Sequence, residues 1–205
     1  MSDTIQGTQE WLDASLGCVT GSRLVDIMPG VKGKYLASRK NYMAEKVIEI
    51  LTNQSIEHFV SEAMQWGTDN EPLARSAYEL STGNLVIERG FVLHPKIEKF
   101  GSSPDGEVNP DGTIEIKCPN TATHINTLIK GYIDRAYMFQ MQGEIMCLDK
   151  KWCDYISYDP RLPDNLQLYI KRIPRDPVMI VEIEMEVKKF QNELNEMLKV
   201  LRSFK

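Results

Sequence analysis

The segment spanning residues 103–119 constrains the fold of this 205-residue chain more than any other. Val108 is followed by a turn-rich stretch that ends in Asp111-Gly112, and the alternating run Thr113–Lys117 comes next. An Asp-Gly pair beside such a run is typical of a tight turn, so the pattern predicts a β-hairpin. Because side chains alternate between the two faces of a strand, the hairpin also fixes where each polar residue of its second strand must lie.

The polar residues of this hairpin are expected to meet at one point. Glu115 and Lys117 would share one face of their strand, Ile116 would point into the core, and Asp105 would lie beside Glu115. Carboxylates and the Ile116 carbonyl are hard oxygen ligands, which suit Mg²⁺. An ordinary exposed Glu/Lys pair follows the same short pattern, so the spacing leaves both interpretations open.

A lysine beside two acids suits the hydrolysis of a phosphodiester. The reaction adds negative charge at the phosphorus oxygens, and a bound metal ion can stabilise that charge and lower the pKa of a bound water. A lysine next to that water can orient it, or accept its proton if the local field depresses the pKa of the lysine.

Composition bounds the class of protein. The chain is 42% hydrophobic and 26% charged, which fits one globular domain over residues 1–205. No apolar run approaches the roughly 18 residues of a membrane span, and the first residues do not resemble a signal peptide. Four widely spaced cysteines favour a reducing, cytoplasmic setting over a disulfide framework or a zinc site. The net charge of −5 argues against a general nucleic-acid-coating protein, but a local basic stripe would suffice for a DNA enzyme.

Hydrophobic periodicity and turn residues predict a mixture of helices and strands. We expect a short helix that is capped by Thr8 and buries Trp11 and Leu12. Further helices are expected over residues 21–28, 35–52, 56–82 (where Gly67 could break the helix), 120–130, 133–147 and 178–203. Strands are expected over 85–93, 100–108, 113–118, 152–158 and 166–173. This order indicates an α/β or mixed α+β fold, in which helices cover the faces of a central sheet.

Two segments could hold phosphate. Thr20 and Ser22 lie at the start of a predicted helix, where hydroxyls and free N–H groups bind anions, although the residues alone favour simple capping. Lys32 and Lys34 belong to the densest basic cluster, which is either a contact for the DNA backbone or a solvated face.

Six short motifs occur in an order that resembles the lambda exonuclease, or YqaJ-type viral recombinase exonuclease, family of the PD-(D/E)xK nuclease superfamily. The resemblance extends from about residue 8 to Asp159 and implies a restriction-endonuclease-like core with a central mixed β-sheet. The motifs are Trp11, Leu16-Gly17-x-Val19-Thr20-Gly21-Ser22, Trp66-Gly67-x-x-x-Glu71, Ser103-Pro104-Asp105-Gly106, Glu115-Ile116-Lys117-Cys118-Pro119 and Tyr137-Met138-x-Gln140-x-Gln142.

The resemblance implies a Mg²⁺-dependent exonuclease, with Mn²⁺ as a substitute, that degrades one strand of linear duplex DNA processively from its 5′ end. A single-strand annealing protein would use the resulting 3′ overhang in recombination. The resemblance also implies a ring-shaped homotrimer, a phage or prophage origin, and a place in the cytoplasm of a bacterial host. An endonuclease of the same superfamily and a non-catalytic DNA-binding module are the alternatives. The second of these predicts an eroded D…ExK set, and the set is intact.

The resemblance also assigns roles to individual residues. Asp105, Glu115 and the Ile116 carbonyl would hold Mg²⁺, and Glu71 would join a second metal position or its water shell. Lys117 would activate the attacking water with help from Gln140. The expected phosphate contacts are Thr20, Ser22, Ser103 and Lys32.

One departure from the family pattern concerns the grip on the DNA end. Ser15 stands two residues before Gly17, where the family typically has an arginine that binds the 5′-phosphate. Losing such a contact costs on the order of 1.5–3 kcal/mol if nothing replaces it. We therefore expect a weaker preference for a 5′-phosphate, or compensation by Lys32, Lys34 or Arg23.

Overall fold

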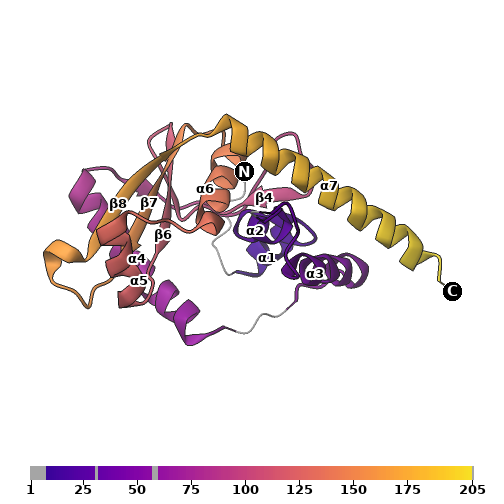
Figure 1. Cartoon of the computed structure of the whole chain (residues 1–205), viewed down its shortest axis with the longest axis horizontal. Coiled ribbons are helices and arrows are strands. Elements are labelled where there is room, and N and C mark those ends of the chain that lie inside the picture. Colours follow the sequence, from indigo (N-terminus) through magenta and orange to yellow (C-terminus); the bar gives the residue numbers. More distant parts are fainter. Residues whose placement is uncertain (1–7, 31, 57–59, 205) are drawn as a thin grey trace.

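The computed structural model describes residues 8–30, 32–56 and 60–204, and its elements follow the predicted order (Figure 1). The helices are α1 (Gln9–Ser15), α2 (Leu24–Ile27), α3 (Ser38–Thr52), α4 (Glu62–Thr82), α5 (Thr121–Lys130), α6 (Arg135–Cys147) and α7 (Pro177–Arg202), with 3-10 helices η1 (Gly21–Arg23) and η2 (Asp164–Leu166). The strands are β1 (Val19–Thr20), β2 (Val86–Ile87), β3 (Val92–Leu93), β4 (Phe100–Ser102), β5 (Gly106–Val108), β6 (Gly112–Lys117), β7 (Trp152–Tyr158) and β8 (Leu168–Pro174).

These strands form two sheets, and the predicted mixed fold is confirmed. The larger sheet has the order β2-β5-β6-β7-β8, with β6 parallel to β7 and antiparallel pairs elsewhere. A smaller sheet has the order β1-β4-β3 and lies beside α6. Among the described residues, no helix combines the length and apolar character that a membrane span requires.

Two of the predicted strands were wrong in their extent. The run 85–93 divides into β2 and β3, and the run 100–108 divides into β4 and β5, with one half of each in either sheet. The second break falls at Ser103-Pro104-Asp105, where the proline has no N–H for a strand ladder. The chain thus changes sheets immediately before Asp105, and this frees that residue from strand pairing.

The hairpin forms as predicted, but its turn lies two residues earlier than the Asp-Gly pair. Val108 pairs with Gly112, so the loop is Asn109–Asp111, and Asn109 takes the left-handed conformation with φ 59°. Gly112 is the first residue of β6 because of packing: an added Cβ would lie 2.2 Å from the Trp152 ring. The glycine serves a close approach between strands rather than the turn.

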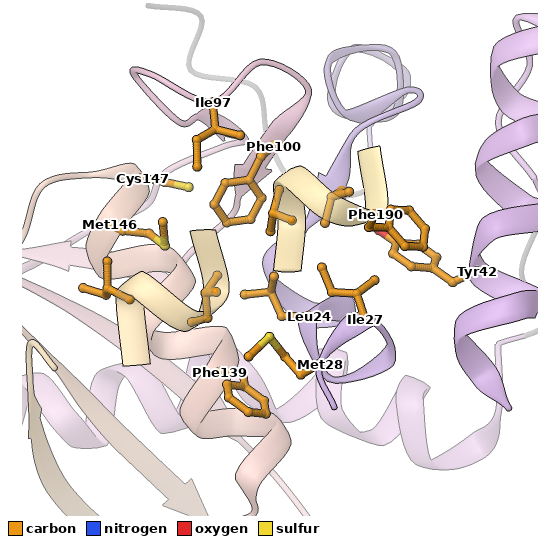
Figure 2. Packing of buried hydrophobic residues seen from close by; sticks show 14 of the residues in the cluster. Leu24, Ile27, Met28, Tyr42, Ile97, Phe100, Phe139, Met146, Cys147 and Phe190 are labelled. Atoms are coloured by element: carbon orange, nitrogen blue, oxygen red, sulfur yellow. The ribbon is translucent and has the colours of Figure 1, made fainter. Parts of the chain in front are cut away.

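The five-stranded sheet is covered on both faces. On one face, α4 packs Ala74 and Tyr78 against Ile114 and Ile116 of β6. On the other face, α6 belongs to a larger cluster that also includes residues of α2, α3 and α7 (Figure 2). In Figure 2 the rings of Phe139 and Phe100 lie on either side of Leu24.

Several helix boundaries differ from the prediction. Helix α3 begins at Ser38 rather than at residue 35, because Tyr35 forms a bridge with Pro29 instead. Helix α4 begins at Glu62, although the prediction started it at 56 and residues 57–59 lie outside the described part of the chain. It continues through Pro72, and the break considered at Gly67 does not occur.

The N-terminal elements differ in part from the prediction, and Trp11 and Leu12 are only half-buried in α1. Thr8 caps α1 by accepting a hydrogen bond from the Trp11 amide at 3.3 Å, as expected. The single helix predicted over 21–28 is a 3-10 turn, η1, followed by the one-turn helix α2. Thr20 precedes η1 but makes no capping hydrogen bond with its side chain, so the capping interpretation does not apply to it.

Candidate active site

The hairpin brings Asp105 to the strand that carries Glu115. Gly106 pairs with Ile114, so Asp105 extends the antiparallel register towards Glu115. The Asp105 Oδ2 atom accepts a hydrogen bond from the Ile116 amide at 2.6 Å. This contact holds the carboxylate against the backbone of β6 and confirms the predicted placement of Asp105 beside the Glu-x-Lys motif.

Glu115 and Lys117 lie on the α6 face of β6 and form an ion pair. The Glu115 side chain is 1% exposed, whereas that of Lys117 is 25% exposed, so the lysine separates the acid from solvent. Within the described residues, both Glu115 oxygens are buried and accept no hydrogen bond of ordinary geometry. The Lys117 Nζ atom also lies 4.9 Å from the centre of the Tyr137 ring. The site is thus a buried carboxylate covered by one cation.

Burial and mutual repulsion govern the charges of this cluster. Burial, and next the charge of Glu115, raise the pKa of the Asp105 carboxyl well above its usual range. Burial acts against the charged form of Lys117, but Glu115 and Asp105 outweigh it and raise the pKa of the ammonium. Without another cation, Lys117 is therefore held as a charged group between two acids.

Glu71 reaches the same cluster from α4. Burial raises the pKa of its carboxyl, Arg75 opposes that change, and Glu115 adds to it, so the two acids feel each other's charge. Glu71 Oε1 accepts a hydrogen bond from Arg75 Nη2 at 2.8 Å, and the same nitrogen lies 3.3 Å from the Asp105 carbonyl oxygen. Arg75 thus connects Glu71 to the segment that leads into the hairpin.

Glu144 is a site residue that sequence reasoning missed. It is fully buried on α6, and its Oε2 atom lies 3.7 Å from the Cys153 Sγ atom on the same face of the sheet. Burial, and next the charge of Glu115, raise the pKa of the Glu144 carboxyl well above its usual range. Its position one turn after Gln140 was the available signal. However, nothing in the sequence distinguishes a buried glutamate from an exposed one on such a helix.

Gln140 lies on α6 between Tyr137 and Glu144, half-buried. In the described part of the chain its side chain makes no hydrogen bond to Lys117 or to the carboxylates. Its suggested role in orienting water therefore stays a prediction.

Two of the predicted hydroxyl contacts, Thr20 and Ser103, lie at the segment that leads to Asp105. Thr20 pairs with Gly101 in the β1-β4 ladder, and an added Cβ on Gly21 would lie 2.1 Å from the Ser102 Oγ atom. Ser103 follows directly, and its hydroxyl accepts a hydrogen bond from the Trp11 indole at 2.7 Å. Ser22 is exposed in η1, which packs against α6.

The predicted basic contacts have different surroundings. Arg23 Nη1 binds Glu45 at 2.8 Å, and its Nε atom pairs with Asp26, so this guanidinium is largely committed within the protein. Lys32 and Lys34 are exposed on the loop after Pro29. Arg135, at the start of α6, donates to the Pro29 carbonyl at 3.3 Å and joins this loop to the helix that carries Tyr137. Sequence reasoning did not consider Arg135 as a cation of this region.

The donor set fits a magnesium ion. Among the described residues, no group of three or more His, Cys, Asp and Glu side chains is close enough to enclose a metal. Mg²⁺ does not need such a cage, because it usually takes one or two carboxylates and keeps several waters. Asp105 and Glu115 supply two carboxylates, and the buried Glu115 oxygens, which accept no hydrogen bond of ordinary geometry and pair with Lys117, are the kind of atom that a cation stabilises.

Comparisons with known proteins show the family and the fold of the chain. The family model described as "YqaJ-like viral recombinase domain" matches residues 10–151. An alkaline exonuclease from Laribacter hongkongensis, LHK-Exo, is 47% identical, with a TM-score of 0.89 over 95% of this chain and 96% of that chain; its complex with dAMP matches equally well. A phage-related exonuclease from Haemophilus somnus 129PT shares the fold at 16% identity, with a TM-score of 0.69 over 90% of this chain and 96% of that one. No curated protein matches the chain.

Proposed function

The chain belongs to the YqaJ-like viral recombinase family, and from this premise we propose a Mg²⁺-dependent exonuclease that degrades linear duplex DNA in the 5′→3′ direction. The family and the 47% identity to an alkaline exonuclease support the role of a DNA exonuclease. The dAMP bound to LHK-Exo is a deoxyribonucleoside monophosphate, which is the product expected of such a reaction.

The observation that carries the proposal is the cluster of Asp105, Glu115 and Lys117 at the end of β6. Asp105 is held by the Ile116 amide, and Glu115 is buried and pairs with Lys117, which faces it from the solvent side. Asp105 and Glu115 would hold Mg²⁺ with the Ile116 carbonyl, and Glu71 would hold a second position or its water shell. Mn²⁺ has the same preference for oxygen ligands and would substitute.

The proposed reaction is hydrolysis of the phosphodiester after the terminal nucleotide. The oxygen of water attacks phosphorus, the bond from phosphorus to the 3′ oxygen breaks, and that oxygen leaves with a proton. When bound, Mg²⁺ supplies a water of lowered pKa and offsets the charge that develops on the phosphate. Lys117 would orient the attacking water through its Nζ atom. It would also accept the proton of that water when Glu115 and Asp105 no longer stabilise the charged ammonium, because the pKa of the lysine then falls.

The protein also has to hold the phosphates of the substrate. Thr20 and Ser103 lie beside the segment that leads to Asp105, and Ser22 is exposed in the adjoining η1, so these hydroxyls would contact the strand next to the scissile bond. Lys32, Lys34 and Arg135 would contact the terminal phosphate of the DNA. Arg23 would contribute less to this contact, because its guanidinium already pairs with Glu45.

Processivity and recombination complete the proposal. A ring-shaped homotrimer would keep the product strand threaded between successive cuts, and a single-strand annealing protein would receive the 3′ overhang. Both follow from the resemblance to lambda exonuclease.

The test is hydrolysis of a linear duplex by the wild type, Lys117→Ala and Lys151→Ala, each with Mg²⁺ and with EDTA. Lys151 is a matched control because its side chain is 74% exposed and pairs only with Asp111 among the described acids. We expect release of mononucleotides by the wild type and Lys151→Ala in Mg²⁺, and none by Lys117→Ala or in EDTA. DNA binding without hydrolysis by the wild type would instead indicate a non-catalytic module.

A further inference from the structure

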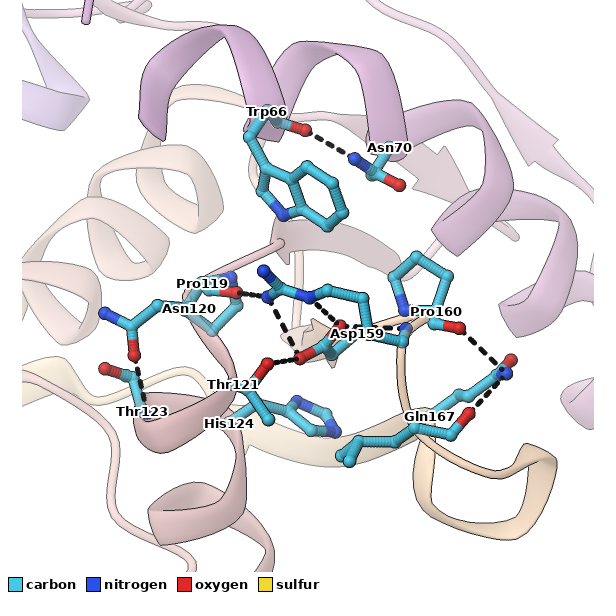
Figure 3. Close-up of polar contacts among 12 residues, drawn as sticks. Trp66, Asn70, Pro119, Asn120, Thr121, Thr123, His124, Asp159, Pro160 and Gln167 are labelled. Carbon is cyan, nitrogen blue, oxygen red and sulfur yellow. Dashed lines mark hydrogen bonds and ion pairs between the residues drawn. The ribbon is translucent and has the colours of Figure 1, made fainter. Parts of the chain in front are cut away.

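A second polar cluster lies at the carboxyl end of β7 (Figure 3). Asp159 is fully buried and accepts hydrogen bonds from the Arg161 Nε atom at 2.7 Å, the Arg161 Nη2 atom at 3.0 Å and the Thr121 hydroxyl at 2.7 Å. Burial acts to raise the pKa of Asp159, but the bonds from Arg161 and Thr121 lower it to about 2. Asp159 is therefore a fixed anion that sets the position of the Arg161 guanidinium.

The guanidinium of Arg161 reaches two further elements. Its Nη2 atom donates to the carbonyl oxygen of Pro119 at 3.1 Å, two residues after Lys117. Its central carbon lies 4.3 Å from the centre of the Trp66 ring, which belongs to α4. One side chain thus contacts both the segment that follows the Glu-x-Lys motif and the helix that carries Glu71.

Trp66 matters because of its place on α4. The buried residues of that helix are Asn70, Ala74 and Tyr78, each four residues apart, and Trp66 extends the same stripe by one turn. The Asn70 side chain donates to the Trp66 carbonyl at 2.8 Å, whereas residues 62–65 are exposed. The Arg161–Trp66 contact and the packing of Trp66 against the apolar cluster on the sheet together hold the N-terminal part of α4 in place.

Contacts on both sides of Glu71 hold α4 against the rest of the protein. On its C-terminal side, Arg75 contacts Asp105 and pairs with Glu88. On its N-terminal side, Trp66 is held by Arg161. Fixing both sides of a short helical segment fixes the direction from which Glu71 approaches Glu115.

We propose that Arg161 is a positioning residue for the metal site, acting through Trp66 and α4 on Glu71. The inference rests on the proposed function of Glu71. A flexible ammonium could replace the charge of Arg161 but not its planar fork, which binds a carboxylate, a carbonyl and an aromatic ring together.

The experiment measures Mn²⁺ affinity by isothermal titration calorimetry and amide hydrogen exchange in α4, for Arg161→Gln and Trp66→Leu. Arg172→Gln is the matched control, because Arg172 also stacks on a tryptophan, Trp152, at 3.5 Å and binds a buried aspartate, Asp154. We expect both test variants to weaken Mn²⁺ binding by about tenfold, the scale typical of residues that support metal ligands, and to speed exchange over residues 66–71. Trp66→Leu keeps the Asp159–Arg161 pair, so it tests the same path if Arg161→Gln folds poorly.

The decisive comparison repeats Arg161→Gln in a Glu71→Gln background. If Arg161 acts through Glu71, it weakens Mn²⁺ binding no further there. An equal loss in both backgrounds, or unchanged metal affinity with weaker DNA binding, would overturn the inference and make Arg161 a DNA contact or a general support. If the wild type binds no Mn²⁺ and degrades no DNA, the proposed function itself has failed; if it does both and Arg161→Gln matches it, only this inference has.

Discussion

The ammonium of Lys117 covers the buried carboxylate of Glu115. The two residues belong to the same strand, β6, and a single residue separates them. The alternation of β6 sends Ile116 to the opposite face, into the cluster under α4. The lysine therefore occupies the approach to the acid that a metal ion would need, and this arrangement sets up a competition between two cations.

Lys117→Met should bind Mg²⁺ or Mn²⁺ more tightly than the wild type while losing hydrolysis. Removing a positive charge in contact with Glu115 removes its repulsion of the metal, and we expect roughly a tenfold or greater gain in affinity at the dielectric typical of such sites. Calorimetric titration of the metal measures this, with Lys151→Met as the control. Weaker binding by Lys117→Met would mean that the lysine supports the metal instead.

Glu144→Gln should stabilise the metal-free protein at pH 8. Because burial raises the pKa of Glu144 in the folded state, the folded protein keeps a proton that the unfolded chain releases. That group contributes its full stability below the unfolded pKa of about 4.3 and loses it as the pH rises towards the folded pKa. The gain in melting temperature over the wild type should therefore shrink as the pH falls towards 4. A gain that is the same at both pH values contradicts the assignment of a buried neutral acid.

Ser15→Arg should sharpen the preference for a 5′-phosphorylated end. A charge-assisted contact contributes about 1.5–3 kcal/mol, so the ratio of rates on 5′-phosphorylated and 5′-hydroxyl duplexes should rise by about ten- to a hundredfold. The Ser15 hydroxyl now bonds only to the Leu12 carbonyl, at 3.1 Å, among the described groups.

Lys32→Ala tests whether the exposed loop compensates for Ser15. If it does, the wild-type ratio should fall in Lys32→Ala and stay unchanged in Lys199→Ala, a control on α7 whose side chain is 71% exposed. A strong wild-type preference that survives Lys32→Ala would exclude this loop as the source.

Gly21→Ala should destabilise the protein by about 1–3 kcal/mol, the usual cost of overpacking. Its new Cβ would lie 2.1 Å from the Ser102 hydroxyl, between the two segments that carry the predicted phosphate contacts. Ser102→Gly removes the clashing atoms, so the double variant should recover stability in a denaturation experiment. No recovery would show that Gly21 is needed for its backbone conformation.

Local patterns predicted the parts of the site that depend on neighbours in sequence. The alternation of Glu115, Ile116 and Lys117 was enough to place them, because the period of a strand is two. The turn was misplaced because Gly112 is required by packing against the Trp152 ring and not by the turn. This contact joins β6 to β7, so a rule based on neighbouring residues cannot predict it.

The remaining features depend on distant partners. The ion pair between Arg23 and Glu45 joins η1 to α3. Glu144 on α6 is buried against β7, where it contacts Cys153. The strand breaks at 88–91 and 103–105 arise because the chain passes between two sheets. Sequence periodicity records which residues are apolar, but not which element covers them.

The most direct test follows the two ends of each strand. A linear duplex labelled either at the 5′ end or at the 3′ end of one strand is digested in Mg²⁺ beside covalently closed circular DNA. We predict immediate release of the 5′ label as a mononucleotide, late release of the 3′ label, and intact circles. Early release of the 3′ label would contradict the direction, and cutting of the circles would make the protein an endonuclease.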